Sequence, residues 1–277
     1  MKTIIVVTDF SQSAQNAFSY ACAFTAASDK IALLLVNINA VPASYSGEGV
    51  SMAAIGDTLE DRIDRLEDEI ERVKQNFPAA TITHKAMVGG YIKTLKALID
   101  EEEAVMIIMG TPASYGEVFS WDTDNLQAMT ELPIPVLSVP KDAVYRPIKQ
   151  LAFASIPGNL HKISPIESIR KLVNYTGAQL HIVSVVLPQH DEEKDRDATL
   201  ALQQQLEGIN TAYHTINNPH VVQAIGQFVE ENNIDLLIVR PRKHGIWYNL
   251  FNKSYAKELA KLNLIPVIAL HDEWNVD

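Results

Sequence analysis

The sequence predicts an α/β fold built from two tandem copies of one unit, each with a five-stranded parallel sheet. Two observations support this prediction. Short apolar runs alternate along the chain with segments of helical periodicity, and four of these runs recur in the same order in the second half. Near-continuous apolar strands separated by helices are typical of a parallel sheet that helices cover on both faces.

The repeat shows in the spacing of the four runs. KTIIVVTDF resembles KQLAFASIP and ALLLVNI resembles QLHIVSV, both at an offset of 147 residues (149 − 2 and 179 − 32). AVMIIMG resembles IDLLIVR at an offset of 130 (234 − 104), and IPVLSVP resembles IPVIALH at 131 (265 − 134). A duplication with one loss of 17 residues (147 − 130) explains these offsets. We therefore expect one domain over residues 1–143 and a second, more diverged domain over residues 144–277.

The first copy opens with two predicted strands, IIVV and LLLVNI, separated by a helix. Apolar side chains recur at helical spacing in that helix, at Ala14, Ala17, Phe18 and Ala21. After the loop ASYSGEG, a heavily charged helix is expected, with its acids and arginines on a solvated face. Its apolar seam is predicted to comprise Leu59, Ile63, Leu66, Ile70 and Val73.

Three more strands, ATITHKAMV, VMIIM and PVLSVP, complete the first copy. Helices are expected around Leu95, Leu98 and Ile99 and over residues 124–132. The second copy repeats this plan, with Ser164 as N-cap and Pro165 as the first residue of its first helix. Ligands of such sheets bind beyond the carboxyl ends of the strands, so the loops after the first and fourth strands are the candidate sites.

Composition excludes several classes of protein. The net charge of −11 argues against nucleic acid and anionic membranes as partners of the whole chain. Cys22 is the single cysteine, so no intramolecular disulfide forms, and we expect a reducing, cytoplasmic location. The apolar run before Asp9 is too short for a signal peptide or a membrane span.

Common catalytic and metal-binding motifs are missing from the sequence. It contains neither G-x-x-x-x-G-K-S/T nor G-x-S-x-G, and its eight histidines do not follow a metal-ligand spacing. We therefore expect neither a catalytic residue nor a metal site, and roles at the surface or core edge for the histidines.

The order of the elements resembles the universal stress protein (UspA-like) family. VVTDFSQSAQNAF, LLLVNI, VGGYIKTLKALIDEEEAVMIIMGT and PIPVLSVP carry the resemblance in the first half. IDLLIVRPRK and LFNKSYAKELAKLNLIPVIALHD carry it, in a more diverged form, in the second. The resemblance implies a Rossmann-like sandwich of the adenine-nucleotide-binding type. It also implies an intramolecular pseudo-dimer of the two halves, with a homodimer of two chains left open.

Some members of this family bind ATP through G-x2-G-x9-G-S/T after the fourth strand. In the first half Gly110 matches the first glycine of this pattern, Met109 just before it is a further candidate site residue, and Thr123 matches the final hydroxyl. Pro112 falls at or beside the second glycine and Asp122 replaces the third. Proline has no N–H to donate and aspartate repels a phosphate, so we expect this loop to be impaired.

The second half departs further from the glycine pattern. Ser254 matches the final hydroxyl, but Arg240, Lys243 and Lys253 occupy the three glycine positions. These basic side chains could attract an anion without a backbone cradle, or they could form a solvated basic loop.

The resemblance also implies an adenosine subsite in the first half. Asp9 matches the family acid near the adenosine, Thr8 stands beside it, and Ile38 matches the residue whose backbone meets the base. The alternative is that Asp9 or Ser11 caps the first helix, and both roles are compatible.

Two functions remain open. One is a non-enzymatic stress-response protein with a degenerate nucleotide site, which acts through unknown protein partners or its conformational state and needs no cofactor. The alternative is a regulator that binds ATP or AMP, with Mg, mainly in the first domain, with slow hydrolysis not excluded. An enzyme of another kind on the same fold has no nucleophile–base constellation to support it.

Overall fold

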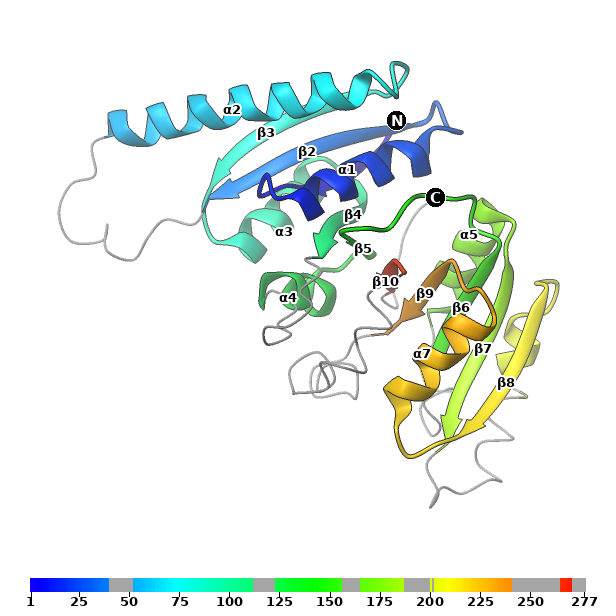
Figure 1. The fold of residues 1–277 in the computed structure, drawn as a ribbon. Helices are drawn as coiled ribbons and strands as arrows, with labels where there is room; N and C mark the ends of the chain where they lie inside the picture. Colours follow the sequence, from blue (N-terminus) through cyan, green and yellow to red (C-terminus); the bar gives the residue numbers. More distant parts are fainter. Residues whose placement is uncertain are drawn as a thin grey trace. The chain divides into compact units, whose positions relative to one another are not determined.

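The chain forms two compact units (Figure 1). Every described strand and helix up to Pro140 belongs to the first unit, and those from Gln150 onward belong to the second. At residues 52–58, 123–124, 155 and 222 only the backbone is described. The computed structural model of this 277-residue protein describes residues 1–39, 52–111, 123–155, 165–186, 200, 202–240 and 265–270.

The first unit is a parallel sheet with the strand order β3-β2-β1-β4-β5. Helix α1 contacts α2, and α3 contacts α4. The right-handed crossovers of such a sheet put these two pairs of helices on opposite faces. The elements are β1 (Lys2–Val7), α1 (Gln12–Thr25), β2 (Ile31–Asn39), α2 (Met52–Lys74), β3 (Ile82–Val88), α3 (Tyr91–Glu101), β4 (Ala104–Thr111), α4 (Thr123–Glu131) and β5 (Val136–Pro140).

The second unit has the matching strand order, β10-β9-β6-β7-β8, and its strands are also parallel. The predicted α/β class with two five-stranded parallel arrangements is therefore confirmed. The described elements are β6 (Gln150–Ser155), α5 (Ile166–Thr176), β7 (Gln179–Val186), β8 (Thr211–Asn217), α7 (Val221–Glu231), β9 (Leu236–Val239) and β10 (Val267–Ala269).

Strand register repeats between the units residue by residue. Ile4 of β1 pairs with Met106 of β4, and Leu151 of β6 pairs with Leu236 of β9. The two pairs occupy equivalent positions in the two sheets, and their residues differ by the sequence offsets of 147 (151 − 4) and 130 (236 − 106). The length change falls between the second and third strands, which are 43 residues apart in the first unit (82 − 39) and 25 in the second (211 − 186).

The charged helix α2 differs from the prediction in two respects. Leu66, Ile70 and Val73 are buried as expected. Ile63 is 37% exposed, so the buried face of the helix does not include this position. Glu69 is only 5% exposed, although the acids of this helix were expected to be solvated. It lies three residues after Leu66, on the face that packs on the sheet.

Helix starts show a second correction. Ser11 is the N-cap of α1, and its hydroxyl accepts from Ala14 N. In the second unit, Pro165 is itself the N-cap of α5, so it does not occupy the first helical position. The proposed cap Ser164 lies outside the described residues.

Candidate functional site

The carboxyl ends of β1, β2 and β4 meet at one edge of the first sheet. Val7 pairs with Val36 of β2 and with Met109 of β4. The residues that follow these three, Thr8, Asn37 and Gly110, are therefore level with one another. The register thus brings the predicted site residues Thr8, Asp9, Ile38, Met109 and Gly110 to one edge of the sheet.

The loop from β1 to α1 carries the exposed acid of this edge. Asp9 is exposed, and its Oδ1 accepts from the N–H of Ser11 at 2.9 Å. Ser11 Oγ accepts in turn from Ala14 N at 3.2 Å, so Ser11 caps the helix and Asp9 braces the turn before it. The Asp9 side chain is therefore exposed beside the N-terminus of α1, where its carboxylate can accept further hydrogen bonds.

Phe10 holds the strained position of this loop. Its φ of 66° is left-handed, which is uncommon for a bulky side chain and costs about 1–3 kcal/mol. Its N–H donates to Thr8 Oγ1 at 2.9 Å, and its carbonyl accepts from Gln15 Nε2 at 3.3 Å. The guanidinium of Arg65 lies 3.9 Å from the centre of the Phe10 ring, a cation–π contact from α2.

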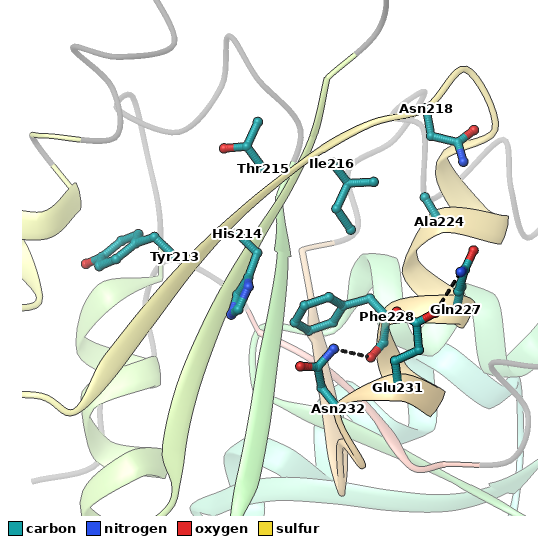
Figure 2. Close-up of a pocket in the computed structure, with 10 residues that line it drawn as sticks. All are labelled: Tyr213, His214, Thr215, Ile216, Asn218, Ala224, Gln227, Phe228, Glu231 and Asn232. Carbon is teal, nitrogen blue, oxygen red and sulfur yellow. Dashed lines mark hydrogen bonds between the residues drawn. The ribbon is translucent and has the colours of Figure 1, made fainter.

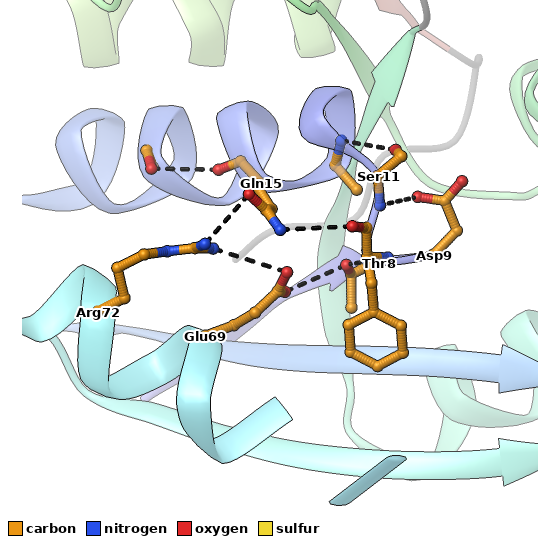
Figure 3. Close-up of polar contacts among 9 residues, drawn as sticks. Thr8, Asp9, Ser11, Gln15, Glu69 and Arg72 are labelled. Atoms are coloured by element: carbon orange, nitrogen blue, oxygen red, sulfur yellow. Dashed lines mark hydrogen bonds and ion pairs between the residues drawn. The ribbon is translucent and has the colours of Figure 1, made fainter. Parts of the chain in front are cut away.

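Thr8 is buried and connects the loop to α2 (Figure 3). Its hydroxyl donates to Glu69 Oε2 at 3.2 Å while accepting from Phe10 N. Arg72 Nη2 lies 3.6 Å from Glu69 Oε1, and Arg72 Nη1 donates to Gln15 Oε1 at 3.1 Å. Burial raises the pKa of Glu69, and the Thr8 hydrogen bond and the Arg72 charge only partly offset this.

A second polar connection runs through Asn37. Asn37 is buried, its Nδ2 donates to Thr8 O at 2.7 Å, and its Oδ1 accepts from Arg62 Nη1. Helix α2 therefore places Arg65 and Glu69 against the β1–α1 loop and Arg62 against the end of β2. This role of the helix was not predicted from the sequence. The signal available was the spacing of Glu69, three residues after Leu66 and four before Val73, on the buried face.

Gly110 lies where β4 packs on the first turn of α1. A Cβ on Gly110 would lie 2.3 Å from Ser13 C and O and 2.6 Å from Ala14 N, which are backbone atoms. Its carbonyl accepts from Asn125 Nδ2 at 3.0 Å. Packing alone therefore requires a glycine here. Met109 is buried, so its side chain faces the core and not the edge.

The other predicted site residues are placed less completely. Ile38 is half-buried on β2 and pairs with Met87 of β3. Thr123 is the first residue of α4, and its side chain is not described. Arg240 is half-buried just after β9. Outside the described residues lie Pro112, Asp122, Lys243, Lys253 and Ser254.

The described part of the chain shows neither a metal-binding cluster nor a membrane-spanning helix. Its side chains include no group of three or more His, Cys, Asp or Glu placed to hold a metal ion. None of its helices combines the length and the apolar character needed to cross a membrane.

Comparison with known proteins gives a family match for the first domain. Residues 1–118 match the universal stress protein family. The first domain of this chain is therefore similar to universal stress proteins over those residues. That domain contains β1 to β4 and so includes the edge with Thr8, Asp9 and Gly110. A search of curated proteins found no match.

Solved structures resemble both halves together. A universal stress protein from Archaeoglobus fulgidus DSM 4304 has a TM-score of 0.72 at 15% identity, with 98% of each chain covered. A putative universal stress protein from Pseudomonas aeruginosa UCBPP-PA14 has a TM-score of 0.55 at 14% identity, covering 98% of this chain and 93% of that one. The cytoplasmic domain of a prokaryotic cation chloride cotransporter has a TM-score of 0.54 at 9% identity, covering 96% and 94%. These similarities show that the universal stress protein fold continues through the second half.

Proposed function

We propose that this universal stress protein is a non-enzymatic, cytoplasmic regulator that keeps an adenosine subsite in its first domain but binds phosphate weakly. Asp9 carries the proposal, because its carboxylate is exposed beside the capped N-terminus of α1, at the edge shared by Ile38. A carboxylate there can accept hydrogen bonds from ribose hydroxyls. In this proposal the protein acts through protein partners that respond to whether a nucleotide is bound at this edge.

The weak phosphate half of the proposal rests on two features. In the glycine loop of the first half, Pro112 falls at or beside the second glycine position and Asp122 replaces the third glycine. In addition, the Thr8 hydroxyl donates its one proton to Glu69, so it cannot donate to a phosphate without breaking a buried contact.

Calorimetric titration with adenosine, AMP and Mg-ATP tests this function. We expect the three dissociation constants to lie within about tenfold of one another, a spread of about 1.4 kcal/mol. Asp9→Ala should weaken all three, and Asp9→Asn, which keeps the acceptor for Ser11 N, separates charge from loop structure. Asp100→Ala, at an exposed position on α3, is the matched control and should change none of them.

Other outcomes have definite meanings. No heat with any nucleotide at millimolar concentration would reject the adenosine subsite. ATP binding more than a hundredfold tighter than adenosine would show an intact phosphate site.

A second candidate, an ATP- or AMP-binding regulator with Mg, is favoured by the arginines of α2. Arg62 and Arg65 both contact the residues at the candidate edge, and their charge would attract an anionic nucleotide. Arg62→Gln and Arg65→Gln should then weaken ATP binding more than adenosine binding. ADP formation over hours, measured by chromatography, reports any slow hydrolysis.

A further inference from the structure

A pocket of about 530 Å³ lies in the second unit between β8 and α7 (Figure 2). Strand β8 follows β7 as the last strand in the order of that unit, so the pocket lies beside an outermost strand. Its described lining comes from the strand and from the helix that follows it. The lining residues are Tyr213, His214, Thr215, Ile216, Asn218, Ala224, Gln227, Phe228, Glu231 and Asn232.

The wall of the pocket on β8 contains one member of a histidine pair. His181 on β7 and His214 on β8 stack at 5.1 Å between ring centres, with His181 Nδ1 3.0 Å from His214 Nε2. His181 Nε2 is 2.7 Å from Gln150 Oε1. Burial lowers the pKa of both rings, and the neighbouring His214 lowers that of His181 further, which favours the neutral form of each ring.

The hydrogen-bond chain assigns the tautomers. Gln150 Oε1 only accepts, so His181 Nε2 carries the proton and His181 Nδ1 is an acceptor. His214 Nε2 must then donate to His181 Nδ1, which leaves the lone pair of His214 on Nδ1. His214, which lines the pocket, thus has an acceptor nitrogen for which the described residues show no hydrogen-bond partner.

The helix wall is also rich in acceptors. Gln227 Nε2 donates to Glu231 Oε1 at 2.7 Å, and Asn232 Nδ2 donates to the carbonyl of Phe228 at 2.9 Å (Figure 2). The nitrogens of both amides are therefore directed at protein acceptors, leaving their side-chain oxygens for a ligand. Glu231 adds a second carboxylate oxygen.

Charge and an aromatic ring complete the set. Among the described lining residues Glu231 is the charged one, and none is a lysine or arginine. Glu231 is the last residue of α7 and Asn232 its C-cap, at the helix end whose dipole favours cations. The ring of Phe228 lies 4.7 Å from the His214 ring and can contact a cation by its face.

We propose that this pocket binds a small organic cation that carries N–H donors, an alkyl guanidinium or a primary alkyl ammonium. The acceptors on both walls receive its N–H groups, Glu231 balances its charge, and Phe228 packs on its apolar part. This site lies in the second unit and is separate in location and ligand chemistry from the adenosine subsite proposed in the first.

NMR titration of the full chain tests the proposal. The probes are n-butylguanidinium, n-butylammonium and n-butylurea, the last being an uncharged molecule of the guanidinium's shape. Long-range ¹H–¹⁵N spectra of the imidazoles report on His214 directly. We expect saturable shifts of His214 Nδ1 with at least one of the cations, and binding at least tenfold weaker for the urea.

Paired variants separate specific recognition from general attraction to an acidic protein. Glu231→Gln should weaken cation binding by tenfold or more. Glu230→Gln, the neighbouring exposed acid outside the described lining, should leave it within twofold. His214→Phe keeps a ring and removes the acceptor, so it should weaken binding too.

Three results would overturn the proposal. The first is the absence of a saturable shift with either cation at 20 mM. The second is equal binding of urea and guanidinium, and the third is an equal loss in the two glutamate variants. Glu231 is exposed, so its variant is expected to fold and decides the outcome even if His214→Phe does not.

Discussion

Thr8 Oγ1 donates to Glu69 Oε2 across 3.2 Å and joins the end of β1 to the middle of α2. The two residues are 61 positions apart, yet both are buried, and Arg72 lies 3.6 Å from the other oxygen of Glu69. Glu69 thus connects α2 to the loop that carries Asp9.

Neutralising Glu69 should change stability in a direction that depends on pH. Burial raises the folded-state pKa of Glu69 above its unfolded value, so its contribution to stability is fully present below the unfolded pKa of about 4.3. That contribution is lost as pH rises through the folded-state pKa. We expect Glu69→Gln to raise Tm at pH 7, with the gain shrinking towards pH 4.

Thermal unfolding across this pH range, followed by circular dichroism, measures the effect. Glu71→Gln, at an exposed position on the same helix, is the control and should show little change. A lower Tm for Glu69→Gln at pH 7 would mean that the Arg72 and Thr8 contacts outweigh desolvation.

Gly110→Ala should destabilise the first unit. Its new Cβ would overlap Ser13 backbone atoms at 2.3 Å, and neither element can rotate a side chain away. Overpacking of this kind costs about 1–3 kcal/mol. Gly90→Ala is matched to it, because a Cβ there meets nothing within 4 Å and φ is −73°. Urea unfolding should show a change of about 0.5 kcal/mol or less for Gly90→Ala, and equal losses would disprove the packing role of Gly110.

The histidine pair should make the second unit sensitive to acid. Burial lowers the folded-state pKa of His181 and His214 below the unfolded value of about 6.5. The unfolded chain therefore takes up more protons as pH falls below that value, and stability drops until the folded-state pKa values are passed. Urea midpoints from pH 7.5 to 5 should fall more steeply for the natural protein than for His214→Gln. His220→Gln, at an exposed position, should follow the natural protein.

Cys22 should report on opening of the first unit. Its thiol is 1% exposed, and burial raises its pKa to about 12. Thiolate is the reactive form, so the folded protein should react with a disulfide reagent far more slowly than a free thiol does. Because the chain has one cysteine, the labelling rate at increasing urea follows this single position. Rapid labelling in the absence of urea would contradict the burial.

The strands were predictable wherever burial on both faces leaves a continuous apolar run. IIVV, LLLVNI and VMIIM correspond to β1, β2 and β4. Strand β8 reads TAYHTIN and was not singled out, because it is the last strand beyond β7 and is mostly half-buried. The contact between His214 on β8 and His181 on β7 could therefore not be predicted from the sequence.

The site was predictable in position and less so in its contacts. The strand ends placed Thr8, Asp9, Ile38, Met109 and Gly110 at one edge, but their individual roles as ligand contacts stay predictions. The connection to Glu69 could not be read from residue type, since an acid in a charged helix is usually solvated. It follows from tertiary packing, which buries the face of α2 between Leu66 and Val73.

The repeated strand register makes every position of one half comparable with a position of the other. Thr8 corresponds to Ser155 and Asp9 to Ile156, both by the offset of 147, whereas α2 and its Glu69 fall in the crossover where the halves differ in length. The two copies in a duplicated chain can acquire different functions in this way. The first copy has Asp9 at the end of its first strand and Glu69 beneath it, whereas the second copy has the same strand order with Ile156 at the position of Asp9, and we propose that it binds a different ligand.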